Sequence, residues 1–354
     1  MKLLPQIKDQ WMRMLAILLG VFAVVITGLS VTGSAQTLRG EATHTAATSS
    51  QNQVQYIIMV ALEGVGEDSL KGGSMPVLSR LVDHGSVTWS AAAVNPPLRL
   101  PTMASLFTGL PVEKHGVTWN NFDFIRGYPR PPTVFDYLET SGGRDSAIFF
   151  MDESLYQLAK PEPYTDYRVC GRFRPECSTA TVVRDILDYF REATSGDGYN
   201  HMVSSLPHFL VIHLPEPGRA GEAHGWDAEP YRAALRTVDD AMGAILDLYQ
   251  ELGLREHTVM IVTTLSGNSE VKPAASGSHS EGDPPRVLWV ASGPGIKEGY
   301  VIKGPVSILD TGATVLRMLG LETYTEWQSR AVEEIFTAQR LPAASRTGGS
   351  ANAR

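Results

Sequence analysis

Residues 54–62 read VQYIIMVAL, a nearly continuous apolar run that ends at Glu63. Two later runs have the same character, HFLVIHL at 208–214 and TVMIVTT at 258–264. A strand covered by helices on both faces carries apolar side chains on both sides, so it lacks the alternation of a strand with one face in water. These three stretches therefore predict the central strands of an α/β sheet.

Amphipathic helical patterns separate the predicted strands. The clearest covers 231–252, where apolar residues recur at spacings of three and four, with Pro230 in its first turn and Gly253 at its end. Asp239 and Asp240 fall on the polar face of this helix and are expected to be solvated. Further helices are expected at 75–84, 102–110 and 181–192, and further strands at 146–151 and 286–291.

This alternation of strands and helices predicts a three-layer α/β/α sandwich with a mostly parallel central sheet over residues 54–340. In such sheets, ligands bind beyond the carboxyl ends of the strands. The residues that follow Leu62, Leu214 and Thr264 are therefore expected to converge on a common site.

The N-terminal segment has the features of a membrane anchor or an export signal. Residues 1–13 form a short region with three basic side chains, and an uncharged apolar run follows over 14–32. Basic residues before such a run predict a cytoplasmic N-terminus and an exported remainder, periplasmic or extracellular. The length suits a single membrane-spanning helix, which would make the membrane a partner. Cleavage near Ala35 is the alternative and would release a secreted chain.

Two further segments lack apolar periodicity. Residues 33–53 are small and polar, which predicts a flexible linker, and 341–354 are rich in Ala, Ser and Gly, which predicts a disordered tail. The chain of 354 residues has a formal net charge of -8 and no run of basic residues. A nucleic-acid-binding domain carries a basic patch or stripe, so nucleic acid is not an expected partner.

The chain has two cysteines, Cys170 and Cys177, which bracket the segment CGRFRPEC. In an oxidising compartment they are expected to close a small disulfide loop, which stabilises a fold by about 2–3 kcal/mol when unstrained. A zinc site is the weaker interpretation, because this spacing without a nearby histidine fits no zinc pattern.

Several motifs in collinear order over 54–335 carry a family resemblance, above all TGLPVEKHGV at 108–117 and GPGIKEG at 293–299. The chain resembles the type I phosphodiesterase/nucleotide pyrophosphatase domains of the alkaline phosphatase superfamily, whose architecture sulfatases share. The resemblance implies the same three-layer fold. It also implies a site in which Asp and His side chains hold two metal ions, usually zinc, and a Thr or Ser attacks phosphorus or sulfur.

The family's catalytic positions are largely replaced in this chain. The resemblance places the nucleophile at Arg99, whose guanidinium stays protonated and cannot attack. Two metal-ligand positions fall on Leu265 and Ser266, and a third falls on Gly218. Thr102 would serve as the nucleophile only if the register slipped by three residues, which the neighbouring motif opposes.

Three ligand positions keep a side chain that can bind a metal. Glu63 and Glu222 are substitutes for the family's ligands, and His279 keeps the family identity. Two interpretations stay open: a residual site for zinc or another divalent cation, or a vestigial set that is paired internally and needs no cofactor. Catalytic zinc typically has three protein ligands, and neither metal site retains that many, which favours the second interpretation.

Arg99 and Asn120 are the candidate ligand contacts. One interpretation of Arg99 is a clamp that chelates a phosphate or sulfate group; the other is a side chain that fills the vacated pocket and pairs with Glu63 or Glu222. Asn120 falls where the phosphodiesterase branch places a phosphate-contacting Asn, and a turn residue is the alternative. His213, inside an apolar run, is expected to be a hydrogen-bonded core residue.

The sequence therefore predicts a catalytically impaired ectodomain, a pseudoenzyme that binds an anion or serves as a scaffold at the cell envelope. A divergent metal-dependent hydrolase of phosphodiesters, phosphonates or sulfate esters is the first alternative. A structural subunit bound to an envelope protein partner is the second.

Overall fold

The computed structural model describes residues 54–123, 125–159, 165–169, 177–195, 206–266 and 285–337. The predicted anchor or signal at 14–32, the linker at 33–53 and the tail at 341–354 lie outside these residues. No helix within the described ranges is both long enough and apolar enough to cross a bilayer.

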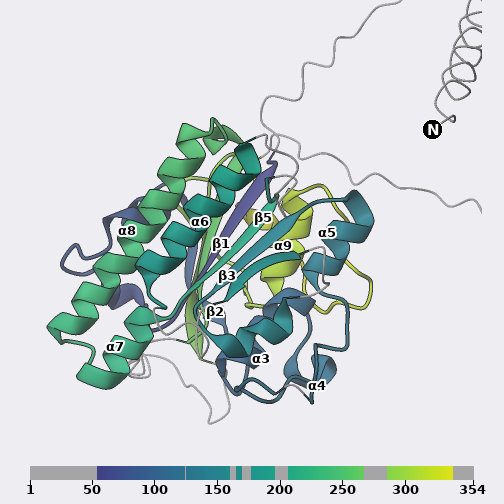
Figure 1. Ribbon diagram of the computed structural model, residues 1–354, viewed down its shortest axis with the longest axis horizontal. Coiled ribbons are helices and arrows are strands. Elements are labelled where there is room, and N and C mark those ends of the chain that lie inside the picture. The colour runs from purple at the N-terminus through teal and green to yellow at the C-terminus, as the bar shows by residue number, and fades with distance from the viewer. Residues whose placement is uncertain are drawn as a thin grey trace, which may run out of the picture. The chain divides into compact units, whose positions relative to one another are not determined.

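An eight-stranded sheet forms the centre of the described fold (Figure 1). Its strands are β1 (Tyr56–Leu62), β2 (Gly85–Ala92), β3 (Ser146–Phe150), β4 (Thr165–Val169), β5 (Phe209–Leu214), β6 (Thr258–Thr264), β7 (Arg286–Ser292) and β8 (Tyr300–Val301). Their spatial order is β4-β3-β5-β1-β6-β7-β2-β8. β7 pairs antiparallel with both of its neighbours, and every other adjacent pair is parallel. The sheet is therefore mixed but mostly parallel, as predicted.

Helices cover both faces of this sheet (Figure 1). They are α2 (Pro76–Asp83), α3 (Arg99–Thr108), α4 (Val112–His115), α5 (Val134–Gly142), α6 (Thr179–Thr194), α7 (Glu216–His224), α8 (Glu229–Glu251) and α9 (Asp310–Met318). The apolar residues of α2, α6 and α8 form one core with the sheet, and those of α3, α5 and α9 form a second core on its other face. The described residues thus form the predicted three-layer α/β/α sandwich.

The side chains of β1 show why its sequence is apolar throughout. Ile57 and Met59 belong to the core under α3, α5 and α9, whereas Ile58 and Val60 belong to the core under α2, α6 and α8. All four are fully buried. Because both faces of the strand leave water on folding, apolar residues are favoured at every position.

Helix α3 begins at Arg99, three residues before the predicted start at 102. Leu98 has the extended backbone of an N-cap residue (φ -93°, ψ 143°). Pro101 lies in the first turn, where its missing N–H costs no hydrogen bond. This start makes Arg99 the first residue of the helix.

The prediction that Asp239 is solvated is wrong. Its side chain is fully buried on α8 and accepts hydrogen bonds from the backbone N–H groups of Val77 (2.8 Å) and Leu78 (2.9 Å) at the start of α2. These N–H groups have no carbonyl partner within their own helix, so the carboxylate satisfies them and joins α8 to α2. Its neighbour Asp240 is exposed, as predicted.

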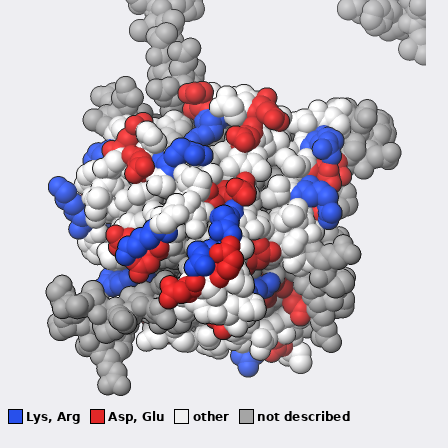
Figure 2. All heavy atoms as spheres, turned by 90° about the vertical axis from the view of Figure 1, so that its left-hand side faces the viewer, with Lys and Arg blue, Asp and Glu red and all other residues white. Residues whose placement is uncertain are grey.

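Charges of both signs are interspersed on the face of the molecule that carries α8 (Figure 2). Some of them form surface ion pairs along the helix, such as Arg232 with Glu229 at 3.0 Å. Among the described residues, the charges on this face are mixed and do not gather into a stripe of one sign.

Candidate functional site

Charged and polar side chains meet at the carboxyl edge of the parallel strands. Glu63 follows β1, Asp152 lies just beyond β3, and His213 lies near the end of β5. Arg99, at the start of α3, reaches both carboxylates. Glu63, the residue after Leu62, lies in this cluster as expected, together with His213 inside β5 and Asp152 beyond β3, which the expectation did not include.

Arg99 and Glu63 form a bidentate ion pair. The Nη2 group of the arginine donates to Oε2 at 2.9 Å, and its Nε group donates to Oε1. Planar guanidinium and carboxylate groups match in this geometry, which makes it one of the stronger charge-assisted contacts. The side chains are 21% and 10% exposed, so little water competes for the pair. The sequence left two interpretations of Arg99 open, and in the structure its side chain is paired internally with Glu63.

A second carboxylate, that of Asp152, also binds Arg99. Its Oδ2 atom accepts from Arg99 Nη1 at 2.7 Å and from Arg219 Nη2 at 3.3 Å. Its Oδ1 atom accepts from the backbone N–H (3.0 Å) and the hydroxyl (2.6 Å) of Ser154, at the start of the 3-10 helix η2 (Glu153–Leu158). Asp152 thus joins two guanidinium groups to the segment that follows β3.

His213 lies beside Glu63 and is fully buried, as the sequence predicts for a core histidine. Its Nε2 atom is 2.8 Å from Glu63 Oε1. Burial lowers the pKa of the imidazole, so the ring is neutral at pH 7 and Nε2–H is the donor. Its Nδ1 atom has no hydrogen-bond partner among the described residues.

Glu63 and Arg99 both keep their charge at neutral pH. Burial works against the ionisation of Glu63, but hydrogen bonds from Arg99 and His213 outweigh it and lower the pKa of the carboxyl to about 2. Burial likewise opposes the charge on Arg99, and the neighbouring carboxylates outweigh it, so the pKa of the guanidinium is raised. The attraction between the ionised Glu63 and Arg99 side chains therefore stabilises this part of the site.

The other predicted ligand positions on this side do not complete a metal site. Glu222 is exposed on α7 and acts on Arg99 as a nearby charge. Gly218 has no side chain, and a Cβ atom there would lie 2.9 Å from the Cβ of Glu63. An acidic ligand at 218 is thus excluded unless the backbone shifts. His279 lies outside the described residues.

The two residues after β6, Leu265 and Ser266, contribute core packing and backbone hydrogen bonds. Leu265 is 1% exposed and belongs to the core under α3, α5 and α9. Its N–H donates to the carbonyl of Leu62 (2.9 Å), and the carbonyl of Ser266 accepts from the N–H of Gly64 (3.1 Å). These hydrogen bonds connect the ends of β1 and β6.

The described residues do not by themselves make up the two-metal site that the family implies. Within the described ranges, no group of three or more His, Cys, Asp or Glu side chains is placed to hold a metal ion. The positive charge between Glu63 and Asp152 is the guanidinium of Arg99. A cation of the protein itself therefore binds both of these carboxylates.

Two further candidates lie on or against α3. Thr102 is fully buried, and its Oγ1 atom has no hydrogen-bond partner among the described residues, so no base in that part of the chain activates it. Asn120 Oδ1 accepts a hydrogen bond from the N–H of Leu100 at 2.9 Å. The amide oxygen of Asn120 thereby caps the first turn of α3.

Cys177 packs, half-buried, against the core under α2, α6 and α8. Cys170 lies outside the described residues, so the disulfide between them stays a prediction.

Sequence reasoning missed Asp152 and Arg219. Asp152 follows the predicted strand at 146–151, so the rule that ligands gather beyond strand ends points to it as well. Arg219 follows Gly218, the position of a lost ligand, and nothing in its own surroundings in the sequence distinguishes it from a surface arginine.

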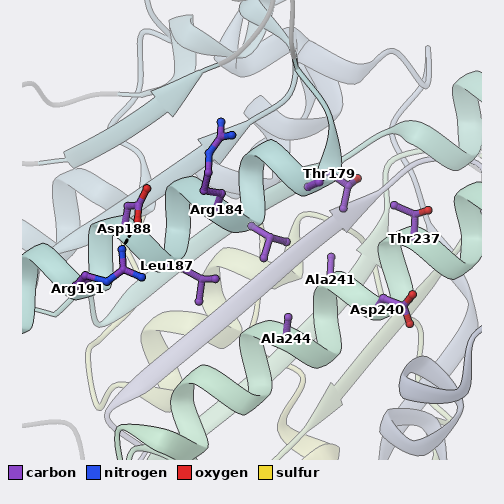
Figure 3. Close-up of a pocket in the computed structure, with 11 residues that line it drawn as sticks. Thr179, Arg184, Leu187, Asp188, Arg191, Thr237, Asp240, Ala241 and Ala244 are labelled. Atoms are coloured by element: carbon purple, nitrogen blue, oxygen red, sulfur yellow. Dashed lines mark hydrogen bonds and ion pairs between the residues drawn. The ribbon is translucent and has the colours of Figure 1, made fainter.

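A separate groove lies between α6 and α8 (Figure 3). It has a volume of about 480 Å³, and its lining combines apolar side chains such as Leu187 and Ala241 with charged ones such as Arg184 and Asp240. None of the site residues predicted from the sequence lines this groove.

The sequence matches one protein family across the central part of the chain. The model of the type I phosphodiesterase/nucleotide pyrophosphatase family matches residues 57–276. The chain belongs to this family.

Ectonucleotide pyrophosphatase/phosphodiesterase family member 1 of Rattus norvegicus is 23% identical over 211 residues, which cover 56% of this chain and 22% of the rat protein. Bis(5'-adenosyl)-triphosphatase enpp4 of Mus musculus is 23% identical over 63% of this chain and 49% of its own length. The chain therefore spans less than half the length of these curated relatives.

Solved structures of the alkaline phosphatase superfamily share the fold. Murine ectonucleotide pyrophosphatase/phosphodiesterase 5, in complex with AMP, has a TM-score of 0.58 at 14% identity and covers 80% of this chain and 100% of its own. A 2-O GAG sulfatase has a TM-score of 0.58 at 12% identity and covers 80% of this chain and 74% of its own. At these identities the likeness establishes the alkaline phosphatase-like fold alone.

Proposed function

We propose that this family member is catalytically impaired and acts as a binding or scaffolding module instead of an efficient hydrolase. The observation that carries the proposal is the bidentate pairing of Arg99 with Glu63. By the family pattern these are the positions of the nucleophile and of the first metal ligand. A protonated guanidinium has no lone pair with which to attack phosphorus or sulfur.

The electrostatics of the site support the same proposal. Hydrolysis of a phosphodiester by a two-metal site requires cations that stabilise both the attacking and the leaving oxygen. Here Arg99 supplies one positive charge, and Glu63 and Asp152 already bind it. Beyond β6, Leu265 offers no ligand atom. Among the described residues, the site thus lacks both a nucleophile and the uncompensated positive charge that the reaction needs.

We further propose that the protein acts outside the cytoplasm. The relatives include proteins named as ectonucleotide enzymes, which is compatible with an exported chain. The apolar segment at 14–32 would hold it to the membrane, or cleavage near Ala35 would release it. Its proposed partners are a phosphate- or sulfate-bearing molecule and an envelope protein.

Metal content and turnover test the proposal. The full chain is purified, its bound zinc and manganese are measured, and hydrolysis of bis-p-nitrophenyl phosphate is assayed with each metal added. We expect substoichiometric metal and no turnover above background. Stoichiometric metal with turnover that His279→Ala abolishes would overturn the proposal and favour the divergent metal-dependent hydrolase. His224→Ala, on the exposed surface of α7, is the matched control.

A further inference from the structure

Two guanidinium groups converge on one carboxylate oxygen at the carboxyl edge of the sheet. Arg99 Nη1 lies 2.7 Å and Arg219 Nη2 lies 3.3 Å from Asp152 Oδ2. The arginines come from α3 and α7, so their convergence depends on the fold and not on neighbouring positions in the sequence. Charged N–H donors that meet at one oxygen are the arrangement that binds phosphate and sulfate groups.

We propose that Arg99 and Arg219 form a metal-free site for a tetrahedral oxyanion, and that Asp152 occupies and closes this site in the free protein. The proposal rests on the proposed function, because a working two-metal site would leave Arg99 no such role. Asp152 Oδ2 stands for one oxygen of the anion, so ligand and side chain compete for the same two donors.

The exposure of these side chains defines how an anion enters. Arg219 is 45% exposed and Asp152 19%, whereas Glu63 is 10% exposed. Glu63 is also held by two hydrogen bonds from Arg99 and by one contact with His213. An entering anion meets Arg219 first and displaces Asp152, while Glu63 keeps the guanidinium of Arg99 in place.

The charge balance explains why the closed state is preferred. With Asp152 in place, two guanidinium groups face two carboxylates, those of Asp152 and Glu63. When Asp152 moves away, one positive charge loses its partner, and the site then attracts an anion. Glu222 adds a further negative charge near Arg99. The wild-type protein is therefore expected to bind a free anion weakly, and neutralising Asp152 should open the site.

Calorimetric titration of the full chain with inorganic phosphate tests this proposal. The buffer contains a chelator and has constant ionic strength. We expect Asp152→Asn to bind one phosphate per chain at least about tenfold more tightly than wild type, because a like charge in contact with the anion is gone. Asp152→Ser is the second variant. Both Asn and Ser can still cap η2, which guards against a folding defect.

Two comparisons make the outcome decisive. Asp240→Asn removes the same charge from the exposed surface of α8 and should bind phosphate as wild type does. Arg219→Gln in the Asp152→Asn background should cancel the gain in phosphate affinity.

The proposal is overturned if Asp152→Asn gains no phosphate affinity, if Asp240→Asn gains as much, or if the gain persists without Arg219. A gain that appears only after zinc is added would contradict both this proposal and the proposed function. The proposed function alone would fail if the wild type hydrolysed bis-p-nitrophenyl phosphate with added metal while Asp152→Asn still bound phosphate more tightly in the presence of chelator.

The same titration distinguishes the source of the anion. Inorganic phosphate and methyl phosphate are titrated separately into Asp152→Asn. Tighter binding of methyl phosphate identifies the ligand as a phosphate monoester, and tighter binding of inorganic phosphate identifies it as the free ion.

Discussion

The two halves of the carboxyl edge differ at the positions where the family pattern places metal ligands. Beyond β1 and β3 the edge carries the carboxylates of Glu63 and Asp152, and Arg99 and Arg219 neutralise them. Beyond β6 the two described residues, Leu265 and Ser266, are uncharged, and Leu265 packs in the core. The first half is therefore polar and held by ion pairs, and the second is held by apolar packing and backbone hydrogen bonds. The binding that we propose concerns the polar half alone.

Restoring an acid in the apolar half should give the largest effect. Truncating a buried Leu costs about 2–5 kcal/mol, and Leu265→Asp also buries an unpaired charge, so we expect a loss of at least about 4 kcal/mol. Urea unfolding measures this loss. Leu265→Met, which conserves volume, is the control and should cost less than about 1.5 kcal/mol. A stable Leu265→Asp protein that binds zinc would show that the two halves do not differ as described.

Removing the internal cation from the charged half should have the next largest effect. Arg99→Met leaves Glu63 buried without its cation, and we expect a loss of about 3 kcal/mol in the free energy of unfolding. Arg236→Met breaks an exposed pair with Glu229 and should leave the free energy of unfolding close to that of wild type. Adding Glu63→Gln to Arg99→Met should recover part of the loss. If Arg99→Met and Arg236→Met lost the same free energy of unfolding, the buried ion pair would stabilise the protein no more than an exposed one.

Acid should weaken the charged half in a defined range of pH. The pKa of Glu63 falls from 4.5 to about 2 on folding, so its contribution to stability is complete above pH 4.5 and is lost as the pH falls towards 2. Urea unfolding of wild type and Glu63→Gln across this range measures the contribution. The difference between the two proteins should shrink as the pH falls. A difference that stays constant with pH would mean that the carboxylate charge does not stabilise the site.

The smallest effect should come from the cap on α3, which supports the charged half indirectly. Asn120→Ala removes the acceptor for the N–H of Leu100 and should cost about 1 kcal/mol. Asn120→Asp keeps an acceptor oxygen and should stay close to wild type. If both variants lose the same stability, the cap is not the reason that Asn120 matters.

Much of the fold could be predicted because the central strands are covered on both faces. β1 and β5 are apolar at nearly every position, and β6 has a continuous apolar run over 259–262, so these patterns identify the strands directly. β2 went undetected because polar residues such as Ser86 and Thr88 are buried within it. The antiparallel direction of β7 also went undetected, since an apolar strand has the same pattern in either direction.

The site could be predicted only in part. The family pattern brings Glu63 and Arg99 to one place, and their pairing is one of the two interpretations that the sequence leaves open. Asp152 could have been found from its place just after a predicted strand, whereas Arg219 enters the site only through the folded arrangement of α7, which no local pattern encodes. Asp239 shows the same limit, because a buried carboxylate that caps another helix has the sequence context of a solvated one.

The central claim is that Arg99, and not a metal ion, supplies the positive charge at the carboxyl edge. Anomalous diffraction at the zinc edge, from crystals of the full chain grown with excess zinc, tests it most directly. We predict no zinc peak beside Glu63 and clear density for the Arg99 guanidinium between Glu63 and Asp152. A zinc ion bound by Glu63, or by Glu222 with His279, and an Arg99 side chain turned away would contradict the account.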